Sequence, residues 1–137
     1  MKYLVDADVL SEPTKPEPSR AALAWLRGHE PDLLLSAVTM GEVRYGVLLL
    51  PKGRRRRNLE RWLASGLARF PVVDFDEAVS QVWAELLAEL RRNGTPMPVT
   101  DSLVAATAVR HGLVVATNNI DHFSRTGVEL INPFDQP

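Results

Sequence analysis

The sequence contains no cysteine among its 137 residues. This excludes disulfide bonds, thiolate metal sites and a cysteine nucleophile, and it favours a cytoplasmic protein. No apolar stretch approaches the roughly 18 residues that a membrane span needs, and the N-terminus enters strand-like sequence without the regions of a signal peptide. The formal net charge is only −1. The chain is therefore no polycation, and any contact with nucleic acid has to come from a local basic patch.

What the sequence does contain is typical of a single domain, residues 1–137. Hydrophobic residues make up 45% and charged residues 24%, an ordinary balance for a globular chain, and no repeat or linker divides it. Short apolar segments alternate with segments of helical periodicity, which predicts an α/β sandwich around a mostly parallel sheet. Right-handed crossovers then bring the carboxyl ends of all strands to one edge. The expected strands lie near 3–5, 33–35 (or a lead into a helix), 72–75, 113–117 and 128–131, the expected helices near 19–27, 39–50, 54–70, 77–92 and 100–111, and a loop at 118–127.

Two acids follow the first apolar run directly. Tyr3, Leu4 and Val5 predict a buried strand, and Asp6 and Asp8 come after its carboxyl end. Open α/β sheets bind ligands at this end of their strands. The alternative is that both acids only cap the turn and helix that follow.

Further acids fall at the same edge of the expected sheet. Thr39 and Glu42 have the spacing of a capping box, which predicts a helix beginning there with Glu42 in its first turn. Asp101 begins another helix, and Asn119 and Asp121 lie in the loop that follows the fourth strand. Each of these acids has a structural explanation of its own as a cap or a loop residue.

Together, these acids indicate a cation. Carboxylates that share one edge repel one another unless a positive charge neutralises them. Oxygen ligands, without cysteine or a suitably placed histidine, favour Mg²⁺ or Mn²⁺ over Zn²⁺. Such a metal lowers the pKa of a bound water and stabilises charge on a phosphodiester. The acids therefore predict metal-dependent phosphoryl chemistry.

Four segments, in order and spacing, resemble PIN-domain ribonucleases, and specifically the VapC-type toxins of bacterial and archaeal toxin–antitoxin pairs. They cover nearly the whole chain, which makes the resemblance specific. The segments are 3–12 (YLVDADVLSE), 35–46 (LSAVTMGEVRYG), 101–108 (DSLVAATA) and 115–123 (VATNNIDHF), with 128–134 (VELINPF) after the last.

The resemblance implies a three-layer α/β/α fold with an acidic pocket for Mg²⁺ or Mn²⁺. Asp6, Glu42 and Asp101 fall on the family's metal-binding catalytic acids, which activate water for hydrolysis of RNA phosphodiester bonds. The expected products carry 5′-phosphate and 3′-hydroxyl ends. The supporting positions of the family's pattern are Asp8, a polar residue near the metal, and Thr117 and Asn119, its Thr-x-Asp/Asn turn.

The sequence departs from the family's pattern, or leaves a choice, at several positions. Some family members carry Asp, a fourth acidic ligand, where this chain has Asn119, a weaker ligand. Asp121 either reaches the metal through water or is an ordinary loop acid. The hydroxyl of Ser102 either touches a metal-bound water or is a common first-turn serine. Gly46, one turn beyond Glu42, either keeps that carboxylate accessible or allows close helix packing.

The only basic cluster runs from Lys52 to Arg57, with Arg61 and Arg69 beyond it. It is either a solvated helix face or a patch that binds the RNA backbone, for which Arg54, Arg55, Arg56 and Arg57 are the candidates. The resemblance also implies a homodimer neutralised by a VapB-like antitoxin, in an assembly that can bind operator DNA. Apolar residues near Trp25 and at 48–50 are candidate antitoxin surfaces.

Two other readings stay open. The opening Val-Asp6-Ala-Asp8 is similar to the haloacid-dehalogenase phosphatase motif, whose first Asp is a nucleophile and whose second is a general acid. That family also needs a later Lys followed by a pair of acids, and Lys2, Lys15 and Lys52 do not supply it. The second alternative is a binding module that acts through nucleic acid or an antitoxin with weak or no catalysis, because Asn119 replaces an acid. The intact set of Asp6, Glu42 and Asp101 argues against it.

Overall fold

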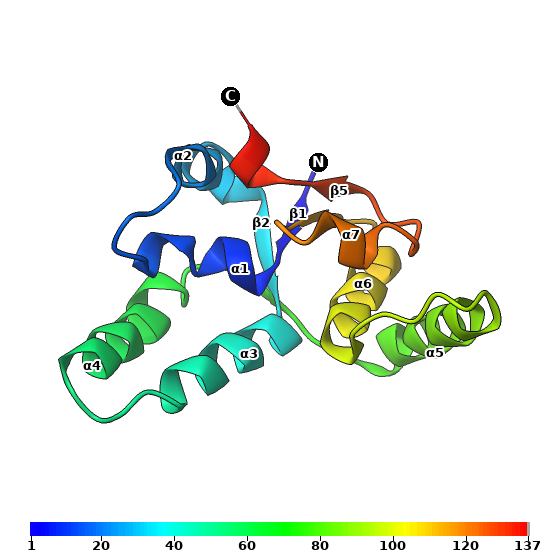
Figure 1. Ribbon diagram of the computed structural model, residues 1–137, viewed down its shortest axis with the longest axis horizontal. Coiled ribbons are helices and arrows are strands. Elements are labelled where there is room, and N and C mark those ends of the chain that lie inside the picture. The colour runs from blue at the N-terminus through cyan, green and yellow to red at the C-terminus, as the bar shows by residue number, and fades with distance from the viewer. Residues whose placement is uncertain (137) are drawn as a thin grey trace.

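A computed structural model describes residues 1–136 and places a five-stranded sheet at the centre of the molecule (Figure 1). The strands lie in the order β3-β2-β1-β4-β5, and every neighbouring pair is parallel. β1 is central, with Tyr3 opposite Leu33 on one side and Val114 on the other. The strands are β1 (Tyr3–Val5), β2 (Leu33–Ser36), β3 (Val72–Val73), β4 (Val114–Ala116) and β5 (Leu130–Ile131).

Helices cover both faces of this sheet, as the alternation along β1 requires. Val5 and Leu35 face a core that includes Val9 of α1, Trp25 of α2 and Val43 of α3. The helices in chain order are α1 (Ala7–Leu10), α2 (Arg20–His29), α3 (Ala37–Leu48), α4 (Arg54–Arg61), α5 (Glu77–Arg92), α6 (Val99–His111) and α7 (Ile120–Phe123).

The opposite face carries a second core. Leu4 and Val115 point to this side, where they meet Val104 and Ala108 of α6 and Phe123 of α7. Helix α5 packs on the outer side of α6, away from the sheet (Figure 1). The expected three-layer α/β/α sandwich is therefore confirmed. Within residues 1–136, no helix combines the length and apolar character needed to cross a membrane.

Several element boundaries differ from the sequence-based expectation. Helix α3 begins at Ala37 rather than Thr39, because the hydroxyl of Ser36 at the end of β2 accepts the Val38 N–H at 3.0 Å. Thr39 is buried inside the helix, so the capping-box interpretation was wrong and Glu42 lies in the second turn. Gly28 does not end α2, which continues to His29.

The basic helix α4 is also shorter than expected. After Arg61 the backbone widens into one π-helical turn, Trp62–Gly66, and the N–H of Leu67 donates to the carbonyl of Trp62 at 3.0 Å. A Cβ at position 66 would stand 2.8 Å from Cδ1 of Trp62, so any other residue there would force the indole ring to shift. The turn directs Leu67 into the core beside Trp25, which ends the helix.

The strand order places a topological switch point between β1 and β4. From β1 the chain proceeds outward to β2 and β3, and then crosses back to β4 and β5. In open α/β sheets, ligands bind in the crevice outside the carboxyl ends of the two strands at such a point. Asp6 directly follows β1, and Thr117 directly follows β4.

Candidate functional site

Asp6 is held at the switch point through both of its carboxylate oxygens. Oδ1 accepts the N–H of Ala7 at 2.9 Å as the cap of α1, and Oδ2 accepts the hydroxyl of Thr117 at 2.8 Å. Its own backbone N–H donates to the Ala116 carbonyl at 2.9 Å, which extends the pairing of β1 with β4. Asp6 is only 5% exposed. The capping role and the site role therefore belong to the same side chain.

The turn after β4 fixes Asp8 as well. The backbone N–H of Asn118 donates to Asp8 Oδ2 at 2.9 Å, while Oδ1 accepts the N–H of Val9 at 2.7 Å. The N–H of Asn119 donates to Thr117 Oγ1 at 2.9 Å. In the described part of the chain, Asn119 thus joins the site through its backbone, by orienting the hydroxyl that contacts Asp6.

Glu42 on α3 and Asp101 on α6 complete the group of acids that surrounds the switch point. The charges of Asp6, Asp8 and Asp101 all act on Glu42, and Asp101 also acts on both acids of the first segment. The structure therefore brings together four of the acids that the sequence singled out.

Burial and mutual repulsion raise the pKa of Asp6, Asp8 and Glu42. Desolvation is the larger cause for Asp6, followed by the charge of Asp8, and together they raise its pKa to about 6 against the hydrogen bond from Thr117. Desolvation followed by the charges of Asp6 and Asp101 raises the pKa of Glu42 to about 7. The pKa of Asp8 is raised as well, chiefly by burial. Buried acids that repel one another form a site that a cation would stabilise.

The donor set fits a hard divalent cation that keeps most of its water. Among residues 1–136, no three Asp, Glu or His side chains are grouped closely enough to enclose a metal ion by themselves. Mg²⁺ seldom needs such an enclosure, because it is usually held by one or two carboxylates together with waters and phosphate oxygens. Asp6, Glu42 and Asp101 would supply those carboxylates, with Asp8 beside them.

The sequence analysis missed His122, because it found no histidine in a position suited to the site. His122 Nδ1–H donates to Oδ2 of Asp101 at 2.7 Å, and the histidine side chain is 47% exposed. The contact fixes one oxygen of Asp101, as partners of metal-binding carboxylates commonly do. The residues are 21 positions apart, and His122 lies on the four-residue helix α7 inside an expected loop. The only available signal was its closeness in sequence to Thr117 and Asn119.

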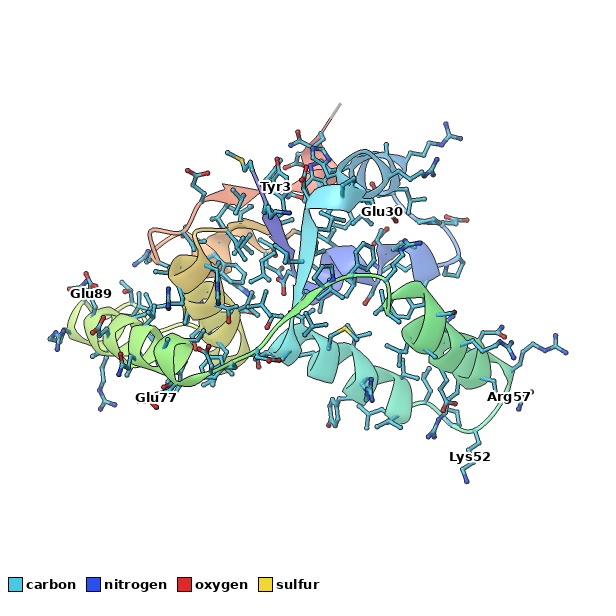
Figure 2. All side chains as sticks on the ribbon, turned by 180° about the vertical axis from the view of Figure 1, so that it is seen from behind. Tyr3, Glu30, Lys52, Arg57, Glu77 and Glu89 are labelled. Carbon is cyan, nitrogen blue, oxygen red and sulfur yellow. The ribbon has the colours of Figure 1, made fainter. Side chains whose placement is uncertain are left out.

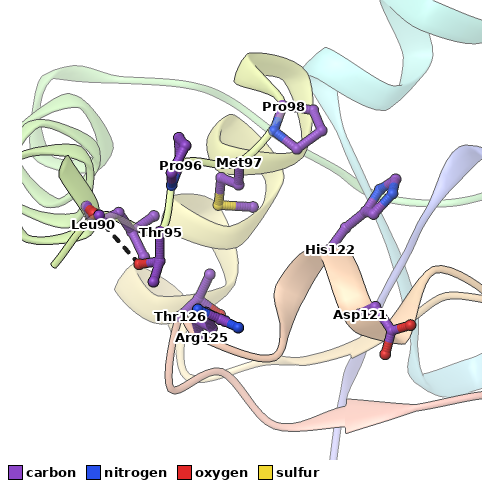
Figure 3. A pocket seen from close by; sticks show the side chains of 10 residues that line it. Leu90, Thr95, Pro96, Met97, Pro98, Asp121, His122, Arg125 and Thr126 are labelled. Carbon is purple, nitrogen blue, oxygen red and sulfur yellow. Dashed lines mark hydrogen bonds between the residues drawn. The ribbon is translucent and has the colours of Figure 1, made fainter.

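In the described part of the chain, neither Asp121 nor Ser102 makes a side-chain hydrogen bond to any of the four acids. Asp121 lines a hollow of about 360 Å³ between α7 and the segment before α6, and it leaves α7 in a different direction from His122 (Figure 3). The hydroxyl of Ser102 is fully buried, accepts the indole N–H of Trp83 at 2.9 Å and donates to the carbonyl of Val99. Its hydrogen bonds join α5 to α6.

Comparison with known proteins gives consistent matches along the chain. Residues 3–129 match the family model described as the PIN domain. The VapC ribonuclease Y4jK of Sinorhizobium fredii is 38% identical over 96% of this chain and 97% of its own length. The crystal structure of FitAcB from Neisseria gonorrhoeae contains a chain that is 35% identical, with a TM-score of 0.92 over 97% of this chain and 99% of that one. A structure of FitAB bound to the IR36 DNA fragment also gives a TM-score of 0.92, at 31% identity over 98% of this chain and 97% of that one.

Proposed function

This chain belongs to the PIN-domain family, and from that premise we propose that it is a Mg²⁺- or Mn²⁺-dependent endoribonuclease, the toxin of a toxin–antitoxin pair. The observation that carries the proposal is the set of four acids at the switch point, where burial and mutual repulsion raise the pKa of Asp6 to about 6 and that of Glu42 to about 7. A relative of nearly the same length is named a VapC ribonuclease, which supports RNA as the substrate.

The residues of this chain have different roles in the proposed reaction, which follow from their positions. A bound Mg²⁺ or Mn²⁺ supplies acidification of water and neutralisation of charge on phosphate oxygens. Asp6 is held rigid by Ala7 and Thr117, so it presents a fixed carboxylate rather than a mobile one. Glu42 and Asp101 approach from α3 and α6, and His122 keeps Asp101 in one orientation.

The same arrangement favours hydrolysis by water over attack by a side chain. The described site offers no histidine free of Asp101, and the hydroxyl of Thr117 is engaged by Asp6 and Asn119. Attack of water in line with the leaving 3′ oxygen leaves a 5′-phosphate and a 3′-hydroxyl. The ends of the products therefore separate this reaction from cleavage by metal-independent ribonucleases that use the 2′-hydroxyl.

We also infer a protein partner, a VapB-like antitoxin, and an assembly of toxin dimers that can bind operator DNA. The complex named FitAB, bound to a DNA fragment, contains a chain of this fold at 31% identity. Leu48 and Leu49 at the end of α3 are 53% and 67% exposed, as a surface for a partner requires. Trp25 itself is buried between Tyr3 and His29, so a partner surface near it would have to be formed by its neighbours on α2.

The test is RNA cleavage by the purified chain, free of any partner, in Mg²⁺, Mn²⁺ or EDTA. Asp6→Asn and Asp101→Asn should abolish cleavage while keeping the native circular dichroism spectrum. Glu89→Gln removes one negative charge from an exposed position on α5 and is the matched control (Figure 2). It should cleave as the wild type does.

Each other result has a defined meaning. Equal cleavage by the wild type and by folded Asp6→Asn would identify a contaminating nuclease and refute the assignment. Products with cyclic phosphate ends would refute water as the nucleophile. Cleavage that persists in EDTA would refute the metal requirement while leaving the family membership untouched.

A further inference from the structure

A groove leads away from the acidic site between α1, α3 and α4. It consists of two adjoining hollows of about 340 and 530 Å³, which share Thr14, Arg55, Leu59 and Trp62 in their walls. The first hollow also includes Glu42 and Gly46. One wall therefore carries a carboxylate of the proposed active site, and the other carries an arginine.

The arginines of α4 are not equivalent within this groove. Arg55 is exposed, and in residues 1–136 it makes no ion pair or side-chain hydrogen bond. Arg56 is engaged by Glu60 at 3.5 Å and by the carbonyl of Leu50 at 3.3 Å. Arg57 lines neither hollow and lies at the far end of the molecule, near Lys52 (Figure 2). Only Arg55 lines both hollows with its charge free.

Gly46 keeps the floor of the groove low. It follows Glu42 by one turn on α3, and a Cβ added to it would meet no atom within 4 Å. Close helix packing therefore does not explain this glycine. A side chain at this position would extend into the open space beside Glu42.

We propose that this groove holds the RNA strand next to the cleaved bond, and that Arg55 binds a phosphate of that strand. The proposal rests on the proposed nuclease function and names the path of its substrate. Four acids at the site repel a polyanion, so a strand that crosses them needs a fixed positive charge nearby, and a guanidinium binds phosphate through paired N–H groups. The open floor at Gly46 leaves room for the backbone between Glu42 and Arg55.

Charge favours RNA over a protein segment as the occupant. An extended nucleic-acid strand presents a phosphate at every nucleotide, and single strands are bound in positively charged grooves that follow their backbone. Arg54 extends the same charge along the second hollow. A protein helix in this position would have to supply acidic residues for two arginines.

The experiment compares Arg55→Gln with Arg57→Gln. The two variants lose the same charge from the same helix, but only the first changes the groove. Binding of a short, labelled single-stranded RNA is measured by fluorescence anisotropy in EDTA, between about 50 and 200 mM salt. We expect Arg55→Gln to bind roughly tenfold more weakly at the lowest salt, with the slope of log K against log salt reduced by about 0.7. The RNA affinity and the salt dependence of Arg57→Gln should stay close to those of the wild type.

Gly46→Leu tests the path without changing charge. Leucine favours the helix and meets no neighbour at Cβ, so the variant should melt as a native protein, yet it should bind the same RNA more weakly. In Mg²⁺, Arg55→Gln should raise KM for RNA cleavage and leave kcat close to that of the wild type.

The outcomes separate this inference from the nuclease assignment. Equal loss of binding in Arg55→Gln and Arg57→Gln, or no loss in either, would overturn the groove as the RNA path and leave it to a protein partner. A wild type that binds RNA through Arg55 but never cleaves it would refute the nuclease function and keep the groove. If the wild type cleaves RNA and Arg55→Gln cleaves it with an unchanged KM, the nuclease function is kept and the groove is refuted as the path of the RNA.

Discussion

Replacing Asp6 with Asn should make the metal-free protein more stable at pH 8 while it abolishes cleavage. Burial, followed by the charge of Asp8, raises the pKa of Asp6 from 3.8 to about 6. One pKa unit corresponds to about 1.4 kcal/mol, so ionised Asp6 costs the folded state about 3 kcal/mol. Asn removes that cost, but it weakens the hydrogen bond from Thr117, which is worth about 1 kcal/mol. The expected net gain is about 2 kcal/mol in the free energy of unfolding.

The gain should depend on pH in a defined direction. Below about pH 3 the carboxyl of Asp6 is protonated in the folded and the unfolded chain, so the charge cost is absent and Asn brings no advantage. As the pH rises from 4 through 6, the unfolded chain loses its proton first, and the folded wild type is progressively destabilised relative to the variant. Above about pH 7 the difference in stability should be constant.

Urea unfolding in EDTA, followed by tryptophan fluorescence at pH 4 and pH 8, measures this difference. In Mg²⁺ the wild type should recover stability that the variant does not, because a cation that binds only the folded state stabilises it by mass action. A variant that is less stable than the wild type at pH 8, or a difference that is equal at the two pH values, would refute the claim that repelling carboxylates destabilise this site.

Three other substitutions test separate parts of the structure. Ser102→Ala leaves the indole N–H of Trp83 without its acceptor, so it should lower the free energy of unfolding by about 1–3 kcal/mol in thermal melting. The variant should still cleave RNA below its melting transition. Loss of cleavage in a folded variant would instead assign Ser102 to the chemistry. His122→Ala frees one oxygen of Asp101 and should weaken Mn²⁺ binding by about 10- to 100-fold in calorimetric titration. Unchanged affinity would show that Asp101 needs no partner to hold its orientation. Gly46→Ala should stabilise α3 by roughly 0.5–1 kcal/mol in chemical denaturation, and a destabilised variant would contradict the open space found beside it.

The sheet, and the position of three acids at one of its edges, could be predicted because they depend on local patterns. The apolar run ending at Asp6 identifies β1, and parallel topology then brings Glu42 and Asp101 to the same edge. Helix α5 could also be predicted, because its cap is local: the carboxylate of Asp76 accepts the N–H of Val79, three residues further on, at 3.0 Å. Such signals lie within a few residues of the feature that they predict.

Features that depend on competition or on distant contacts were beyond the sequence. Ser36 and Thr39 are both capable caps, and the end of β2 decides in favour of Ser36 because its hydroxyl accepts the free N–H of Val38 in the first turn. In the sequence Ser102 resembles an exposed first-turn serine, but in the structure its hydroxyl accepts the indole N–H of Trp83, 19 positions away. The contact of His122 with Asp101 depends on a helix too short to show periodicity.

The hydrogen bond between Asp6 and Thr117 joins residues 111 positions apart, and this separation has a consequence for synthesis. A chain that is still being translated lacks β4, so it lacks the hydroxyl that orients Asp6, the amide that holds Asp8, and the partner of Asp101. A nascent chain or a prematurely terminated fragment therefore carries the first acids of the site without a competent arrangement of them. A nuclease built in this way becomes dangerous to RNA only after β4 and the turn that follows it have been synthesised.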